Sequence, residues 1–152
     1  MNFILFENET DRDNLLPFTF TRPVASIRCG ILTIAGKWEH VLQTNVSYKT
    51  REYLQSKFAL KTAATNYFIN GAIFPDATLV KEITGLKVNE ALYAGDTLLA
   101  SCVTGTDENA ATCQIQSASS PARISYTYDI FSRNGQAIED DFKLLTEGRT
   151  SR

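Results

Sequence analysis

The sequence predicts an α/β fold with a largely parallel sheet, and three observations indicate it. Short apolar runs at residues 2–6 and 66–70 have the composition of strands that are covered on both faces. Stretches with apolar residues at helical spacing lie between and after these runs. The chain of 152 residues is long enough to bury a substantial core in one domain. Strands that alternate with helices pack as layers, with the helices against a mostly parallel sheet.

After the first predicted strand, the chain is expected to continue as loop. Residues 7–14 are polar and charged, which is typical of a surface loop. Pro17 and Pro23 disfavour helix across residues 16–23. Gly36 then permits a turn, and a short helix is predicted over residues 37–42.

The middle of the chain predicts a further helix and the second buried strand. Apolar residues at helical spacing predict a helix over residues 47–58, with Ser47 as its N-cap. The strand at residues 66–70 stops at Gly71.

Residues 76–103 predict a helix followed by a hairpin. Asp76 can cap a helix that ends at Gly85. Residues 90–103 predict two short strands around a turn at residues 94–96.

The last third of the chain predicts a loop and then helix. Residues 104–121 are polar and weakly patterned, which indicates a loop. Residues 129–145 predict two helices interrupted at Asn134-Gly135, because glycine commonly ends a helix. The aromatic residues expected in the core are Phe3, Phe6, Phe68, Phe131 and Phe142.

The composition excludes several classes of protein. A formal net charge of −2 gives no electrostatic reason to expect binding to nucleic acid, which usually requires a basic patch. The apolar runs fall far short of the roughly 20 residues that span a membrane, and no secretory signal is evident. The three cysteines, Cys29, Cys102 and Cys113, show no C-x-x-C spacing. They predict free thiols in a reducing cytoplasm rather than disulfides or a metal site.

Residues 16–42 have a layout suited to binding phosphate. A Thr-Arg-Pro segment follows the first strand and its loop, and Gly-Lys then opens a helix. Arg22 and Arg28 can bind phosphate bidentately, and Lys37 can lie at a helix N-terminus, where phosphates are favoured. Alternatively, the two arginines are surface charges or pair with Glu7, Asp11 or Asp13, and Lys37 is a solvated first-turn residue.

The remaining polar candidates each have a structural alternative. His40 is the single histidine, which argues against a Ser-His-Asp triad or a multi-histidine metal site and favours partly buried packing. Asp76 is a candidate Mg²⁺ ligand or an N-cap, and Asp96 is a turn residue after Gly95. Asp140 and Asp141 are expected on an exposed helical face.

The chain resembles a known family over most of its length. The matching patches are 15–25, 27–34, 37–39, 69–71, Gly95-Asp96, 129–131, Asn134-Gly135, 141–146 and Gly148-Arg149. In these patches it is similar to the N-terminal domain of bacterial sugar nucleotidyltransferases. Those proteins are related to the bifunctional N-acetylglucosamine-1-phosphate uridylyltransferase and glucosamine-1-phosphate acetyltransferase, which makes UDP-N-acetylglucosamine.

The resemblance implies a fold and a reaction. The fold is a three-layer, Rossmann-like, mostly parallel sheet of the nucleotidyltransferase type, reduced in size, over residues 1–152. The reaction transfers a nucleotidyl group from UTP or dTTP to a sugar 1-phosphate and releases pyrophosphate. Cationic side chains, backbone N–H groups and Mg²⁺ serve this chemistry. Family members typically continue into a left-handed β-helix, and a homo-oligomer is compatible with the family.

The resemblance also implies roles for individual residues. Arg22 and Arg28 are the catalytic candidates. The nucleotide- and phosphate-binding candidates are Arg12, Thr19, Lys37, Asn70 and Gly71. The metal candidate is Asp76, with Asp96 as the alternative.

Two departures from the family pattern support a second hypothesis. The segment 7–14 holds four acidic residues and no glycine, where relatives have a glycine-rich loop. The family's Gly-Asp pair reads Gly71-Ala72. The second hypothesis is therefore a catalytically inactive domain with a ligand-sensing or assembly role.

Overall fold

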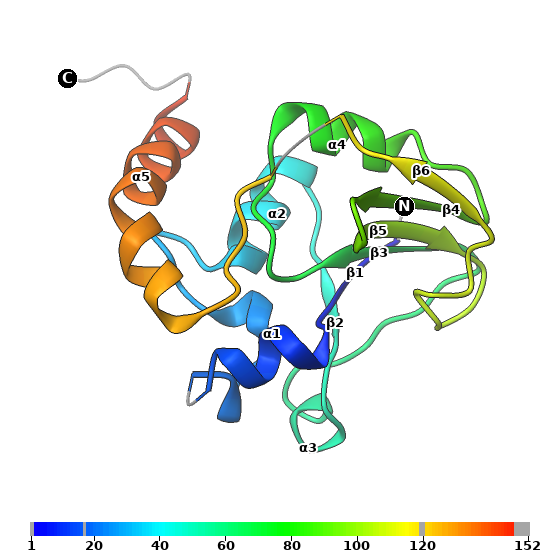
Figure 1. Cartoon of the computed structure of the whole chain (residues 1–152), viewed down its shortest axis with the longest axis horizontal. Coiled ribbons are helices and arrows are strands. Elements are labelled where there is room, and N and C mark those ends of the chain that lie inside the picture. The colour runs from blue at the N-terminus through cyan, green and yellow to red at the C-terminus, as the bar shows by residue number, and fades with distance from the viewer. Residues whose placement is uncertain (1, 17, 119–120, 148–152) are drawn as a thin grey trace.

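A six-stranded mixed sheet forms the centre of the protein, as a computed structural model shows for residues 2–16, 18–118 and 121–147 (Figure 1). The strand order is β2-β1-β3-β5-β4-β6. Within the described residues, β5 runs antiparallel to both neighbours and the other pairings are parallel. The mostly parallel α/β fold is confirmed. The strands are β1 (Asn2–Phe6), β2 (Ser47–Lys49), β3 (Asn66–Asn70), β4 (Glu90–Ala94), β5 (Thr97–Val103) and β6 (Cys113–Gln116).

Side-chain caps define where the helices begin. Asn8, Thr33 and Asp76 accept hydrogen bonds from backbone N–H groups in the first turns of α1, α2 and α4. None of the described helices is long and apolar enough to cross a membrane. The helices are α1 (Glu9–Asn14), α2 (Ile34–Leu42), α3 (Glu52–Gln55), α4 (Ala77–Thr84) and α5 (Thr127–Thr146), with 3₁₀ turns η1 (Phe18–Phe20) and η2 (Val24–Ser26).

The two faces of the sheet are covered differently. The main core joins one face to α2, α4 and α5, and its members include Leu5, Ile69, Trp38, Ile83 and Ala137. The other face carries a smaller cluster of Ile4, Phe6, Phe68 and Val103, packed against Leu60, Leu98 and Ala111. Leu60 and Ala111 come from the connections before β3 and after β5, so irregular chain covers much of this face.

The predicted helix over residues 47–58 is wrong for its first half. Ser47 begins β2 instead of capping a helix, and it pairs with Ile4 of β1. The Ser47 hydroxyl donates to the carbonyl of Lys61 at 3.2 Å. Parallel pairing along the edge of β1 outweighs the local helical pattern, and only α3 remains helical.

Two segments predicted as loop contain regular structure. Residues 9–14 form α1, because Asn8 caps the first turn and Asp11 and Arg12 are buried. Residues 113–116 form β6, which pairs with β4 at the edge of the sheet. Both elements depend on partners distant in sequence, which the local composition does not reveal.

Helix α5 is continuous, so the predicted break at Asn134-Gly135 is wrong. Its N-terminus is fixed by the Asp129 carboxylate, which accepts from the backbone N–H groups of Ser125 and Tyr126. Phe131 and Phe142 are exposed on this helix, against the expectation that both lie in the core. Phe3, Phe6 and Phe68 are buried as expected. Pro17, Gly148 and Arg149 lie outside the described residues.

A buried carboxylate fastens α5 to the N-terminal third of the chain. Asp141 accepts hydrogen bonds from the backbone N–H groups of Ile31 and Leu32, both at 2.9 Å. The Lys37 ammonium lies 2.6 and 2.5 Å from its two carboxylate oxygens. The expectation of an exposed Asp141 is therefore wrong, and so is the alternative of a solvated Lys37, since both side chains are buried.

Substitutions at two glycines test how α5 packs on the domain, and they should change the free energy of unfolding in opposite directions. A Cβ at Gly30 would lie 2.7 Å from the backbone carbon of Ala137, and Gly30 has a φ of +84°. We expect Gly30→Ala to lower the free energy of unfolding by about 2 kcal/mol or more. A Cβ at Gly135 meets nothing within 4 Å, so Gly135→Ala should raise that energy by about 0.5–1 kcal/mol. Urea denaturation measures both, and destabilisation by Gly135→Ala would contradict a continuous helix.

The ion pair can be tested by a double-mutant cycle. Asp141→Asn leaves the Lys37 charge buried without a counter-charge, so unfolding should become easier by about 3 kcal/mol or more. Adding Lys37→Met removes that charge, and the double variant should be more stable than Asp141→Asn alone. Chemical denaturation followed by Trp38 fluorescence gives the energies. An Asp141→Asn variant within about 1 kcal/mol of the wild type would show that the pair contributes little.

Candidate functional site

A cavity of about 540 Å³ opens where β1, β3 and β4 end and β5 begins. Ligands of open α/β sheets bind at this carboxyl edge, and cavities of about 300–1,000 Å³ suit small molecules. We call it the carboxyl-edge cavity. Its lining residues are Phe6, Glu7, Asn8, Glu9, Thr10, Asn70, Asp96, Thr97, Leu98, Glu108, Asn109 and Arg123.

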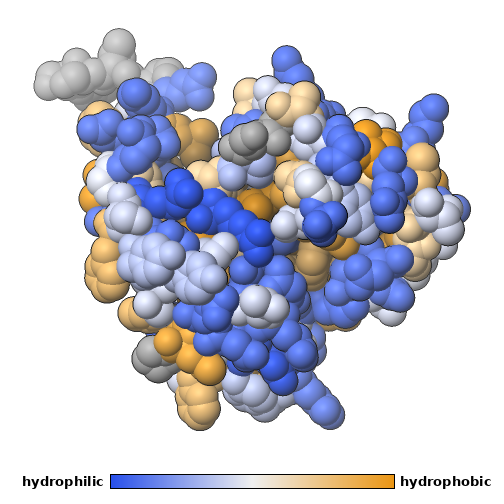
Figure 2. All heavy atoms as spheres, in the orientation of Figure 1, coloured by the Kyte–Doolittle hydropathy of each residue, from blue (hydrophilic) through white to orange (hydrophobic). Residues whose placement is uncertain are grey.

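A smaller hollow of about 150 Å³ adjoins the cavity. The two share Glu7, Asn8, Glu9 and Glu108, and we call the smaller one the side lobe. It adds Arg12, Lys49, Thr50 and Arg51 to the lining. In the space-filling view, hydrophilic residues dominate the surface over α1 (Figure 2). The combined site is polar and carries charges of both signs.

Carboxylates pair with the cations around these hollows. Arg12 Nη1 lies 3.1 Å from Glu7 Oε1, and Lys49 forms an ion pair with Glu108. Arg51 approaches Glu9 at 3.6 Å and Asp13 at 4.0 Å. The acidic residues of segment 7–14 are therefore balanced by arginines.

Glu7 organises the start of the site. It follows β1 directly, and its Oε1 accepts from Arg12 and from the Thr50 hydroxyl at 2.5 Å. Its Oε2 accepts from the backbone N–H of Val24 at 2.8 Å. One carboxylate thus joins α1, the end of β2 and η2 beside the cavity.

Arg123 enters the cavity from the segment after β6. This segment pairs with the chain after β3, through hydrogen bonds from Phe74 N to Ala122 O and from Ile124 N to Ala72 O. Arg123 Nη2 donates to both carboxylate oxygens of Asp11 at 2.8 Å. Its Nη1 donates to the Thr97 hydroxyl at 3.2 Å, and its buried Nε has no partner among the described residues.

The structure brings two of the predicted ligand-binding residues to the site. Arg12 lines the side lobe, and Asn70 lines the main cavity at the end of β3. The Asn70 amide donates to Leu98 O at 3.2 Å, and its oxygen accepts from Ala72 N at 2.9 Å. These bonds fix the Asn70 side chain at the cavity wall.

Two others lie behind the site. The Thr19 hydroxyl donates to the carbonyl of Arg12 at 2.6 Å and is fully buried. Gly71 N donates to Phe6 O at 2.7 Å, and a Cβ at Gly71 would lie 3.0 Å from Ala25 Cβ. Both positions hold the neighbouring backbone in place without lining the cavity.

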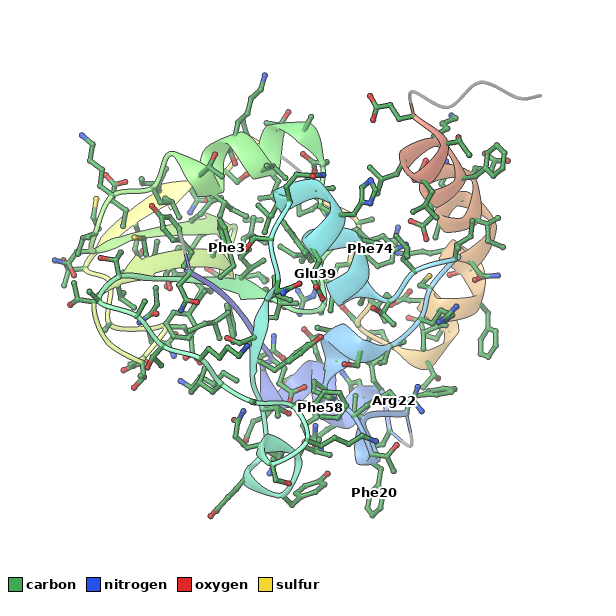
Figure 3. All side chains as sticks on the ribbon, turned by 180° about the vertical axis from the view of Figure 1, so that it is seen from behind. Phe3, Phe20, Arg22, Glu39, Phe58 and Phe74 are labelled. Carbon is green, nitrogen blue, oxygen red and sulfur yellow. The ribbon has the colours of Figure 1, made fainter. Side chains whose placement is uncertain are left out.

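The other candidates lie away from the carboxyl-edge cavity and side lobe. Arg22 and Arg28 are exposed, and Arg28 Nη1 donates to Ile31 O at 3.0 Å. Figure 3 shows Arg22 in the same region as Phe20, which points away from the protein. Lys37 lines a separate cavity of about 170 Å³, where Phe74 lies between α2 and α5 (Figure 3). Asp76 caps α4, accepting from Leu79 N at 2.8 Å.

In the described part of the chain, neither a metal-binding cluster nor a shifted pKa points to a second functional site. No group of three or more His, Cys, Asp or Glu residues there could hold a metal ion. Burial is the largest cause of a raised pKa at the side chains of Cys29, Glu39, Tyr48, Tyr67 and Cys102. None of these five groups lines the carboxyl-edge cavity. The electrostatics of the carboxyl-edge cavity are therefore set mainly by its ion pairs.

Sequence reasoning missed Asp11, Lys49, Thr97, Glu108 and Arg123 as site residues. Lys49 ends a strand that was expected to be helix. Thr97 follows the predicted turn after β4, so the hairpin position was a usable signal. Arg123 and Glu108 belong to connections without periodicity, and nothing local points to them.

Comparison with known proteins places the chain in a family. A family model described as sugar nucleotidyl transferase matches residues 3–150. No curated protein matches the chain.

The Asp11–Arg123 pair makes a prediction about stability at the site. Asp11 is buried and Arg123 partly exposed, so Arg123→Ala should lower the unfolding free energy by about 1–3 kcal/mol. Asp11→Asn in the same chain removes the stranded charge and should restore part of the loss. Thermal and urea denaturation of the two single variants and the double variant measure this. Strict additivity of the two changes would contradict the coupling.

Proposed function

Because the chain belongs to the sugar nucleotidyl transferase family, we propose that it joins a nucleoside triphosphate to a sugar 1-phosphate at the carboxyl-edge cavity. The supporting observation is the position of this cavity at the ends of β1 and β3, with the Arg123 guanidinium in its wall and those of Arg12 and Arg51 in the adjoining side lobe. Its volume of about 540 Å³ suits a small polar ligand.

The proposed reaction is a substitution at phosphorus. An oxygen of the sugar 1-phosphate attacks the α-phosphorus of the nucleotide. The bond from that phosphorus to the oxygen bridging to the β-phosphate breaks, and pyrophosphate leaves with its electron pair. The main demand on the protein is to position the phosphates and to stabilise their charge. Lys49 and Arg123 are the side chains we assign to this task, while Arg12 holds Glu7 in place beside them.

We propose that Asp96 would hold Mg²⁺ together with the phosphates of the substrates. Mg²⁺ at phosphate sites is typically held by one or two carboxylates together with substrate phosphates. Asp96 is exposed and lines the cavity, whereas Asp76 is engaged as the N-cap of α4. When bound, the ion would neutralise phosphate charge. We therefore prefer Asp96 to Asp76 as the ligand.

We propose specific substrates on the basis of the family resemblance. UTP and dTTP are the nucleotides to test first, and N-acetylglucosamine 1-phosphate is the first sugar, with UDP-N-acetylglucosamine as the expected product. The three free cysteines support a reducing compartment, and we propose the cytoplasm.

A second function is favoured by one specific observation. Arg12, Lys49 and Arg123 already have carboxylate partners, which lowers the net positive charge available to a triphosphate. This supports a domain that binds a ligand without turnover, in sensing or assembly.

A pyrophosphate-release assay distinguishes the two functions. With Mg²⁺, UTP or dTTP and a panel of sugar 1-phosphates, the transferase should release pyrophosphate, and a chelator should abolish the release. Asp96→Asn should lower the rate about 100-fold or more, the scale of losing one electrostatic stabiliser of a transition state. Asp140→Asn is the matched control, because Asp140 is an exposed carboxylate on α5 outside the cavity.

The possible results distinguish the transferase from the ligand-binding domain. Turnover in the wild type and Asp140→Asn, lost in Asp96→Asn, supports the transferase. Stabilisation by nucleotide in a thermal shift assay without any pyrophosphate release supports the ligand-binding domain. Neither turnover nor stabilisation with any substrate pair would refute both.

A further inference from the structure

Helix α5 carries an apolar stripe that its own domain does not cover. Tyr128, Phe131, Ile138 and Phe142 are 63, 73, 42 and 62% exposed. They recur at intervals of three, seven and four residues, so they lie along one side of the helix. In Figure 2 hydrophobic residues appear along the left rim, over α5. The largest apolar patch on a protein surface is often a functional one.

The stripe is distinct from the face by which α5 packs on its domain. The packed face includes Ile130, Ala137 and Asp141. Phe131, Ile138 and Phe142 each follow one of these residues, and one position turns the helix by about 100°. The stripe therefore points sideways and remains open while α5 is seated.

Gly135 occupies the centre of the stripe. Tyr128 and Phe142 lie seven residues on either side of it, and Phe131 and Ile138 lie four before and three after. A glycine within a helix costs about 1 kcal/mol relative to alanine. The domain gives no reason for this cost, because a Cβ at Gly135 would meet nothing within 4 Å.

We propose that this stripe pairs with the same stripe of a second copy of the chain, with the two α5 helices antiparallel and their two-fold axis at Gly135. The near-symmetric spacing makes the stripe complementary to itself, as a two-fold interface requires. Tyr128 then packs near Phe142 of the partner subunit, and Phe131 near Ile138 of the partner subunit. The missing side chain at Gly135 lets the helices approach at the axis, and antiparallel helix dipoles attract.

The area that the stripe offers is close to the lower limit for a specific pair. An aromatic side chain presents about 150–250 Å² to bury. At the observed exposures, the four stripe residues offer about 400–600 Å² per copy, or about 800–1,200 Å² for the pair. A specific interface needs about 1,000 Å².

Sedimentation velocity tests the association. The wild-type chain should sediment as a dimer whose dissociation constant rises at least about tenfold in Phe131→Asp/Phe142→Asp, because charges would be buried without partners. Both residues are exposed, so the fold should persist. The control Arg133→Gln/Gln136→Glu changes the net charge equally at exposed positions outside the stripe and should remain dimeric.

Two further variants test the geometry. Gly135→Leu adds apolar surface but blocks close approach, so it should weaken the dimer, whereas non-specific apolar association would strengthen it. With the exposed Cys113 changed to serine, Gly135→Cys should form a disulfide-linked dimer, because only residues near the axis face themselves. Tyr128→Cys in place of Gly135→Cys should not form a disulfide-linked dimer.

The proposal is overturned by any of three results. The first is a wild-type chain that is monomeric at all concentrations, which would leave the stripe to a different partner. The second is a dimer that survives Phe131→Asp/Phe142→Asp or strengthens in Gly135→Leu. The third is Tyr128→Cys cross-linking as readily as Gly135→Cys, which would indicate parallel helices.

Discussion

The Asp141 carboxylate is the interaction on which the seating of α5 depends. It neutralises the buried Lys37 on α2 and satisfies two backbone N–H groups in the turn before that helix. A buried charge without these partners would be strongly unfavourable. The turn at residues 30–32 and the last long helix are therefore fixed by one group, and Gly30 is needed where the two backbones meet.

The same physical principle shapes the carboxyl-edge cavity. Glu7 and Asp11 lie in the segment after β1, and each is held by an arginine. Arg12 is local to Glu7, but Arg123 lies 112 residues from Asp11 and arrives through the segment that pairs beside Ala72. Ion pairing thus holds the segment after β1, which includes α1, in place without glycine.

The sequence allowed the central strands, the hairpin and the α4 cap to be predicted, because those features follow local pattern and cap chemistry. It did not allow β2 and β6, because edge strands are stabilised by pairing with distant residues. Arg12 and Asn70 were found through the family resemblance. Arg123 was not, since its position depends on a contact with residues 72–74 rather than on its neighbours. Gly135 was interpreted as a helix break, because the sequence pattern alone does not show whether a helix continues through a glycine.

The exposure of the ion pairs determines how a cavity whose cations already have carboxylate partners could bind a phosphate. The Arg12 and Glu7 side chains are only 5 and 8% exposed, so this pair is part of the structure. Lys49 is 35% exposed at the side lobe and Arg123 is 31% exposed at the cavity, so an arriving anion can reach the N–H groups of both without unfolding the core. Water weakens a partly exposed pair such as Lys49–Glu108, so exchange of that carboxylate for a phosphate costs little, whereas full release of Arg123 would leave the buried Asp11 charge unpaired. Arg12 therefore acts through the shape of the site, while Lys49 and Arg123 are the cations that a ligand can reach.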